Sequence, residues 1–132
     1  MSLFEECKKA LKNDFQIISD IDVEDVYTKL NMYPIKQNYI LWKNIDFKDF
    51  DDMEELLESM QTIQNENVYV VADDQNIPVF TSKLTSIIEN IYDVMALCPK
   101  VFIFNETILL EPLFPTYTLR VAFNPNLNKS HI

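Results

Sequence analysis

Glycine is missing from all 132 residues, and its absence removes whole families of fold from consideration. An average protein contains about 7% glycine, so a chain of this length without any is unusual. P-loop enzymes and dinucleotide-binding domains need glycine where the backbone approaches a phosphate, because any side chain there would block the approach. The sequence therefore excludes these nucleotide-binding classes in their usual forms.

Length and charge narrow the choice further. A chain of 132 residues with 48% apolar residues can bury its own core as a single domain spanning residues 1–132. The net charge of −10 disfavours nucleic acid as a partner, since nucleic acid is itself a polyanion. No apolar run approaches the roughly 18 residues of a membrane helix, and the N-terminal segment is acidic where a secretory signal is basic. We therefore expect a cytoplasmic protein without membrane contact.

The sequence offers little for metal or nucleophilic chemistry. Cys7 and Cys98 lie far apart and form no CxxC pair, so both are expected to be reduced, buried or half-buried thiols. The single histidine, His131, lies near the end of the chain, within residues 124–132, for which the polar composition predicts a frayed tail. A structural zinc site therefore lacks ligands, and no cofactor is expected.

Apolar residues recur at helical spacing in four segments. These cover residues 3–15, 22–30, 46–63 and 81–97. In the third segment Asp49 or Asp51 is the expected N-cap, and in the fourth Thr81 or Ser82.

Segments rich in β-branched and aromatic residues predict strands. They are residues 38–42, 68–72, 77–80, 101–104, 107–110 and 117–123. The second and third of these predict a hairpin, with Pro78 on an edge strand because proline donates no hydrogen bond. In the last one, Tyr117, Leu119, Val121 and Phe123 alternate with smaller or polar residues and are expected to be buried. The order of elements predicts an α+β fold: a mostly antiparallel sheet of about five or six strands with helices packed on one face.

Three carboxylates are candidates for a metal site. Asp73 and Asp74 follow an apolar strand, where hard oxygen ligands are rigidly presented, and Glu111 could supply a third ligand. A hairpin turn built by the aspartates is the alternative.

Two further residues have both a functional and a structural interpretation. Arg120, the only arginine, could hold a substrate carboxylate or could pair with Glu106, Glu111 or another carboxylate on the sheet. Trp42 could be a binding hot spot or part of the core.

The most acidic segment is residues 46–60, DFKDFDDMEELLESM, which has seven carboxylates and one lysine, a local charge of −7 + 1 = −6. On a helix, Asp51 with Glu55 and Glu54 with Glu58 are like-charged neighbours, and each such pair costs about 0.2 to 0.5 kcal/mol. Glu89 and Asp93 repeat this spacing. A cationic partner would relieve the repulsion, whereas a simple solvated face would leave it in place. A metal site would need the carboxylates to converge, which a convex helix face does not allow.

Both the docking surface and the solvated face remain open from sequence. If the segment docks a partner, the binding carboxylates are expected to be Asp46, Asp49, Asp51, Glu54, Glu55, Glu58, Glu89 and Asp93.

A small, acidic α+β chain without a cofactor, with its carboxylates gathered on one face, resembles the immunity proteins of bacterial contact-dependent growth inhibition and related polymorphic toxin systems. The resemblance implies a cytoplasmic inhibitor that binds a toxin domain, often a basic nuclease, and blocks or covers its active site. It is a resemblance of size, charge and architecture, and it implies no particular site residues.

Two other functions remain possible from the sequence. One is an enzyme that uses Asp73, Asp74 and Glu111 on a divalent metal. The other is a phage or plasmid protein whose acidic surface imitates nucleic acid and occupies a DNA-binding protein. Metal titration would test the first, and the identity of the neighbouring genes would separate the second from an immunity protein.

Overall fold

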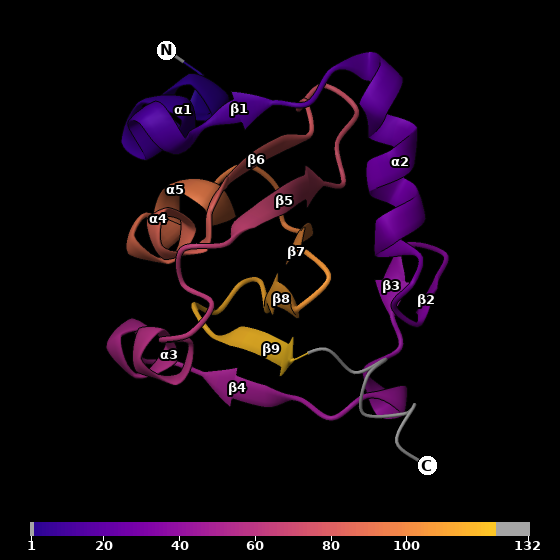
Figure 1. The fold of residues 1–132 in the computed structure, drawn as a ribbon, viewed down its shortest axis with the longest axis vertical. Coiled ribbons are helices and arrows are strands. Elements are labelled where there is room, and N and C mark those ends of the chain that lie inside the picture. Colours follow the sequence, from indigo (N-terminus) through magenta and orange to yellow (C-terminus); the bar gives the residue numbers. More distant parts are fainter. Residues whose placement is uncertain (1, 124–132) are drawn as a thin grey trace.

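Seven strands form one antiparallel sheet in the computed structural model, which describes residues 2–123 (Figure 1). Their order across the sheet is β1-β6-β5-β7-β8-β9-β4. Their bounds are β1 Gln16–Ile17, β4 Lys48–Phe50, β5 Asn67–Ala72, β6 Phe80–Lys83, β7 Val101–Phe104, β8 Ile108–Pro112 and β9 Leu119–Phe123. A separate two-stranded hairpin joins β2 (Ile35–Lys36) to β3 (Tyr39–Ile40).

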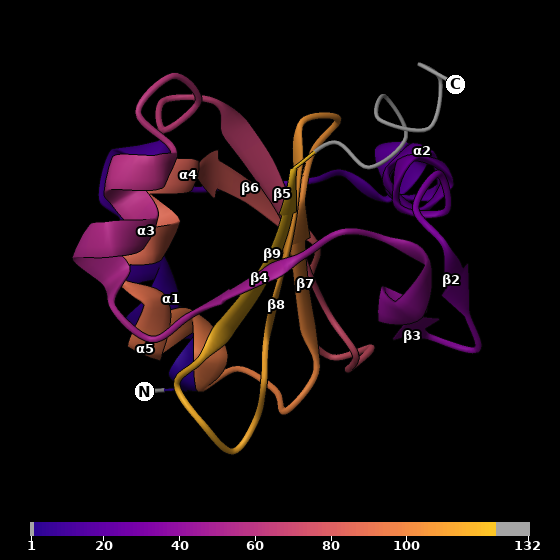
Figure 2. The same ribbon diagram turned by 90° about the horizontal axis from the view of Figure 1, so that it is seen from below.

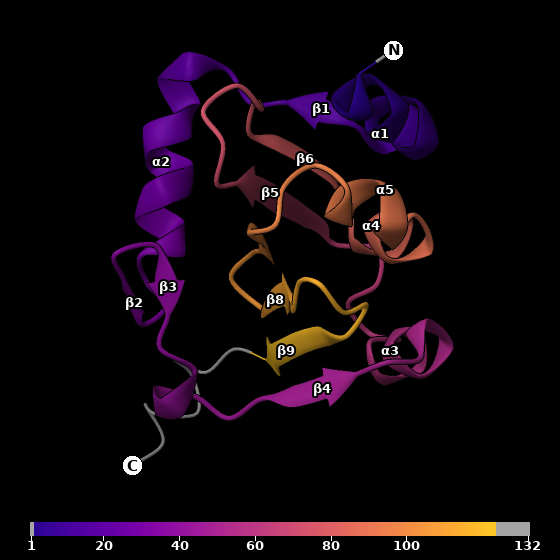
Figure 3. The same ribbon diagram turned by 180° about the vertical axis from the view of Figure 1, so that it is seen from behind.

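Helices cover both faces of this sheet. They are α1 Leu3–Leu11, α2 Asp20–Leu30, α3 Met53–Ser59, α4 Leu84–Glu89 and α5 Ile91–Met95, with short 3-10 turns at Lys12–Asp14 and Trp42–Asn44. Figure 2 shows α1, α3, α4 and α5 on one face, and α2 with the β2-β3 hairpin on the other. Seen from behind, α2 runs across the strand direction (Figure 3). The predicted α+β class with a mostly antiparallel sheet is confirmed. The sheet has seven strands, and helix α2 packs on the face opposite to the other four helices, whereas helices were expected on one face only.

Each face of the sheet has its own apolar core. On the side of the four helices, Leu56 and Ile87 pack with the sheet residues Val70 and Ile103. On the other side, Val26 and Leu30 of α2 share a smaller core with Phe104 and Leu109. All four residues of β7 are buried, as expected for a strand covered on both faces. This explains why 101–104 is continuously apolar in sequence.

The last strand also differs from its expected pattern. Leu119 and Val121 are buried as predicted, but Tyr117 lies before the strand with 65% of its surface exposed, and Phe123 is 40% exposed. The burial of these two aromatic residues was wrongly predicted. Ala122, on the opposite side of the strand, is buried in the α2-side core instead.

The predicted helix 81–97 is divided in the structure. Thr81 and Ser82 belong to strand β6, so neither caps the helix, which begins at Leu84 after Lys83. Asn90 then separates α4 from α5, and its side-chain amide donates a hydrogen bond to the carbonyl of Ser86 at 2.9 Å. An asparagine side chain that bonds the backbone competes with helical continuation, which accounts for the break.

The acidic segment begins as a strand and only then becomes a helix. Lys48, Asp49 and Phe50 pair with Val121, Arg120 and Leu119 of β9, which makes β4 one edge of the sheet. Phe50 is buried and fixes this pairing to the core. Helix α3 starts at Met53, and its N-cap is Asp52, which accepts a hydrogen bond from the Glu54 amide at 2.9 Å. Asp49 and Asp51 were therefore the wrong choice of cap.

The predicted hairpin of β5 and β6 is confirmed, but its second strand runs from Phe80 to Lys83 rather than over 77–80. Pro78 lies before that strand, and β1 pairs with the far side of β6, so β6 is not an edge. Of the predicted strand 38–42, only Tyr39–Ile40 is a strand. Its turn uses Gln37 and Asn38 at φ values of 54° and 65°, a left-handed region in which glycine is common.

Both cysteines are free thiols, Cys7 buried and Cys98 half-buried, and burial raises the pKa of Cys7 to about 12. Within residues 2–123 no helix has the length and apolar character to cross a membrane. The tail 124–132, with His131, lies outside the described residues.

Candidate partner-binding surface

Arg120 binds a carboxylate of the chain itself. Its Nε and Nη2 atoms donate to the two carboxylate oxygens of Asp49 at 2.8 and 3.0 Å. This bidentate pair joins β9 to β4 at facing positions of the ladder. The hydrogen bonds from Arg120 hold the pKa of Asp49 below its usual range and raise that of Arg120. Asp49, predicted to bind a partner, is therefore already engaged, and the structural interpretation of Arg120 is confirmed.

A small aromatic cluster surrounds this pair. The Arg120 guanidinium lies 4.2 Å from the centre of the Phe47 ring, and the Trp42 indole donates to Glu111 at 2.9 Å. Burial raises the pKa of Glu111 despite that hydrogen bond and the nearby cations. Trp42 packs against the α2-side core, which agrees with its structural interpretation. The cluster fastens the segment before β4 onto the sheet.

Three more carboxylates of the acidic segment bond to the chain itself. Asp51 accepts a hydrogen bond from the Thr118 hydroxyl, Asp52 caps α3, and Glu55 lies 3.7 Å from the Lys48 ammonium. Together with Asp49 they form what we call the paired set: Asp49, Asp51, Asp52 and Glu55.

The remaining predicted carboxylates form the open set: Asp46, Glu54, Glu58, Glu89 and Asp93. None of their carboxylate groups has a hydrogen bond or ion pair with another residue in the described part of the chain. Asp93 is half-buried and the other four are exposed. The paired set differs in that each carboxylate bonds to a group of the chain, and two of them, Asp49 and Glu55, bond to a cation.

The fold brings most of the open set to one side of the molecule. Helices α3, α4 and α5 cover the same face of the sheet, and α3 packs against α4 (Figure 2). Glu54 and Glu58 therefore share a face with Glu89 and Asp93, although some thirty residues separate the two pairs in sequence. Of the predicted like-charged helix pairs, only Glu54 and Glu58 lie within one helix. Asp51 precedes α3, and the break at Asn90 separates Glu89 from Asp93.

The three candidate metal ligands do not meet. Asp74 accepts a hydrogen bond from the Asn76 amide at 2.9 Å and builds the turn after β5, whereas Glu111 is bound to Trp42. No group of three or more His, Cys, Asp and Glu side chains in residues 2–123 is placed to hold a metal ion. The turn interpretation of Asp73 and Asp74 is the one that the structure supports.

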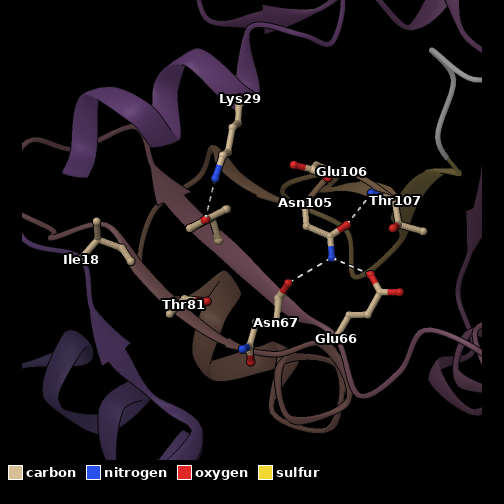
Figure 4. A pocket seen from close by; sticks show the side chains of 9 residues that line it. Ile18, Lys29, Glu66, Asn67, Thr81, Asn105, Glu106 and Thr107 are labelled. Atoms are coloured by element: carbon tan, nitrogen blue, oxygen red, sulfur yellow. Dashed lines mark hydrogen bonds between the residues drawn. The ribbon is translucent and has the colours of Figure 1, made fainter.

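A cavity of about 350 Å³ lies on the α2 side of the sheet, between α2, β5 and the β7-β8 turn (Figure 4). Most of its polar groups form hydrogen bonds with one another. Lys29 donates to Tyr69 at 3.3 Å, and the Asn105 side chain donates to Glu66 and to the Asn67 carbonyl, each at 3.0 Å. These bonds fix the β7-β8 turn against β5.

Sequence patterns missed one exposed feature near the open set. The rings of Tyr92 in α5 and Tyr117 in the β8-β9 loop meet at 4.9 Å between centroids, and both are about two-thirds exposed, at 64% and 65%. The strand-like alternation around Tyr117 suggested burial. The pair of prolines at 112 and 115 could have indicated a loop there.

The described residues form an α+β fold with exposed carboxylates on its helical side. A family model described as CdiI immunity protein, EcoliA0-like, matches residues 1–122, so the chain belongs to that family. A search of curated proteins returned no match. As a member of the family, the protein is an immunity protein that neutralises a toxin.

Proposed function

We propose that this immunity protein neutralises a cationic toxin domain, such as a nuclease, by binding it in the cytoplasm through the open set of carboxylates. The observation that carries the proposal is the division between the two sets. Arg120, Lys48, Thr118 and the start of α3 engage the paired set, whereas the carboxylates of Glu54, Glu58, Glu89 and Asp93 lie on one side of the sheet without a hydrogen bond or ion pair to a described residue.

Electrostatics favours such a surface for fast capture. Unlike charges on facing surfaces raise association rates by about 10- to 1000-fold, and the gain falls as salt shortens the Debye length to about 10 Å at 0.1 M. With a net charge of −10, the protein attracts a basic domain and repels nucleic acid. An immunity protein gains from this because the toxin must be bound before it reaches its substrate.

The test is the association rate with the cognate toxin domain of this immunity protein, to be sought among the neighbouring genes. We expect the double variant Glu54→Gln, Glu58→Gln to associate about 3- to 10-fold more slowly at low salt, with the difference fading at high salt. Cells that carry the variant should lose part of their protection against the toxin. An unchanged association rate would contradict the proposal.

A matched control is available on the opposite face. Asp20 and Glu24 of α2 are exposed, and neither carboxylate has an ion pair with a described residue. Asp20→Asn with Glu24→Gln removes the same two charges from the other side of the sheet, where α2 lies (Figure 2). This control should associate nearly as fast as the unmodified protein. If both variants slow equally, net charge rather than the α3 face determines capture.

A further inference from the structure

The exposed rings of Tyr92 and Tyr117 differ from four other aromatic rings of the chain in what lies over them. Tyr39, Phe47, Phe50 and Tyr69 each lie under a cation of this protein: Lys100 at 3.2 Å, Arg120 at 4.2 Å, Lys48 at 4.9 Å and Lys29 at 5.4 Å from the ring centre. No lysine or arginine of residues 2–123 lies over Tyr92 or Tyr117. Within the described residues the two rings therefore lack a contact that four other rings of this chain make, and the exposed residues Tyr27, Phe114 and Phe123 lack it too.

The two rings are held in place rather than left on a loose loop. Within the β8-β9 loop the Leu113 amide donates to the Thr118 carbonyl and the Thr116 amide to the Leu113 carbonyl, both at 2.9 Å. The Thr118 hydroxyl donates to Asp51, which ties the loop to the segment before α3. Tyr92 lies on α5, whose residues Ile91 and Val94 are buried in the core. A rigid aromatic pair costs little entropy when a partner binds.

The charge around the pair selects the kind of partner. Residues 89–93 and 113–118 contain Glu89 and Asp93 and no lysine or arginine, and Asp51 adjoins the loop through Thr118. An aromatic face beside carboxylates suits a cation, because the ring attracts the charge and the carboxylates stabilise it at short range. Arginine fits best, since its flat guanidinium stacks on a ring and still donates hydrogen bonds at its edge.

We infer that Tyr92 and Tyr117 anchor the toxin interface by receiving a basic side chain of the toxin domain, arginine by preference, on their exposed rings. This inference rests on the proposed function, since it takes the cationic toxin domain as the occupant. It adds a division of roles: the open set accelerates encounter, and the tyrosine pair slows dissociation. Tyrosine is enriched among the few residues that dominate protein interfaces, which agrees with this role.

The test uses two double variants and the cognate toxin domain as the probe. Tyr92→Leu with Tyr117→Leu keeps apolar bulk but removes the rings, and should raise the dissociation rate about 10-fold or more with little change in association rate. Tyr92→Phe with Tyr117→Phe keeps the rings and should dissociate nearly as the unmodified protein does. Because both residues are about two-thirds exposed, neither change should alter the melting temperature much.

Tyr39→Leu is the matched control, because Tyr39 is 63% exposed on the hairpin of the other face and already stacks with Lys100. It should leave dissociation unchanged. If the double leucine variant dissociates normally while Glu54→Gln, Glu58→Gln slows association, the tyrosine anchor is wrong and the acidic surface stands. If the leucine variant dissociates fast but the charge variant associates normally, the anchor stands and the acidic surface fails. Normal rates for both would overturn both.

Discussion

Two groups of carboxylates have different surroundings, although Asp46, Glu54 and Glu58 of the one group lie within a few residues of the other in sequence. The paired set bonds to Arg120, Lys48, Thr118 and the α3 backbone, whereas the open set has no such bond to a described residue. The paired set bonds the edge strand β4 to β9 and caps helix α3. Acidic composition alone therefore does not distinguish the carboxylates that stabilise the fold from those to which we assign binding.

The comparison is useful because it separates stability from binding. Neutralising a member of the paired set should lower the free energy of unfolding, since it removes a bond. Neutralising a member of the open set should leave that free energy unchanged or raise it slightly, since it removes only repulsion. Substitutions in the two sets therefore test this distinction through their effects on stability.

The largest difference in stability is expected between a substitution on the buried side of α3 and one on its exposed side. Leu56 is fully buried beneath the helix, and Leu56→Ala should lower the free energy of unfolding by about 2 to 5 kcal/mol through lost burial and the cavity left behind. Glu58→Gln, on the same helix, should change it by less than about 0.5 kcal/mol, in the stabilising direction. Urea denaturation measures both. A Glu58→Gln loss comparable to that of Leu56→Ala would mean that the open set is structural.

Asp49→Asn should have the next largest effect. It removes the charge from the bidentate pair with Arg120, and because both side chains are partly exposed we expect a loss of about 1 to 2 kcal/mol. The pKa of Asp49 is lowered in the folded state, so its contribution is fully present above the unfolded value of about 3.9 and is lost as pH falls below that value. The gap between the two proteins should therefore close below about pH 4. A gap that is constant down to pH 2 would show that the charge is not responsible.

Asp52→Ala tests the helix cap. Loss of the hydrogen bond to the Glu54 amide should cost about 1 kcal/mol, as for other N-caps. Asp52→Ser should recover most of it, because serine also accepts from the helix backbone. Thermal melting of the two variants makes the comparison. If serine and alanine behave alike, the negative charge of Asp52 near the helix dipole matters more than its hydrogen bond.

Lys48→Gln should have the smallest effect. The Lys48 to Glu55 pair is 3.7 Å long, and both side chains are more than half exposed, so we expect a loss below about 0.5 kcal/mol. The weakness of this pair places Glu55 at the border of the two sets. A larger loss would place Glu55 firmly with the structural carboxylates.

The sequence predicted the parts of the fold that local pattern determines. Strands β5, β7 and β8 and the α+β class follow from apolar runs between turn residues, and they are confirmed. The pattern of 48–50 could not reveal β4, because Lys48 and Asp49 are poor strand formers. That strand exists through its pairing with β9 and the burial of Phe50. Pairing between distant segments leaves no periodic signal.

The candidate surface was predicted only in outline. The acidic segment and the Glu89 to Asp93 region were identified from charge, but charge could not show that Arg120 engages Asp49 or that Asn90 divides the second helix. The exposed Tyr92 and Tyr117 were hidden for a similar reason, since their exposure depends on where the β8-β9 loop lies relative to α5. Which side chains are already satisfied is a property of the folded chain.

The central claim is that the toxin domain covers the open set on the α3, α4 and α5 face. Carbodiimide labelling of carboxyl groups, read by mass spectrometry with and without the bound toxin domain, tests this claim residue by residue. We predict that Glu54, Glu58 and Glu89 lose their labelling in the complex, whereas Asp20 and Glu24 on α2 keep theirs. Undiminished labelling of Glu54 and Glu58, with protection at Asp20 and Glu24 instead, would contradict it.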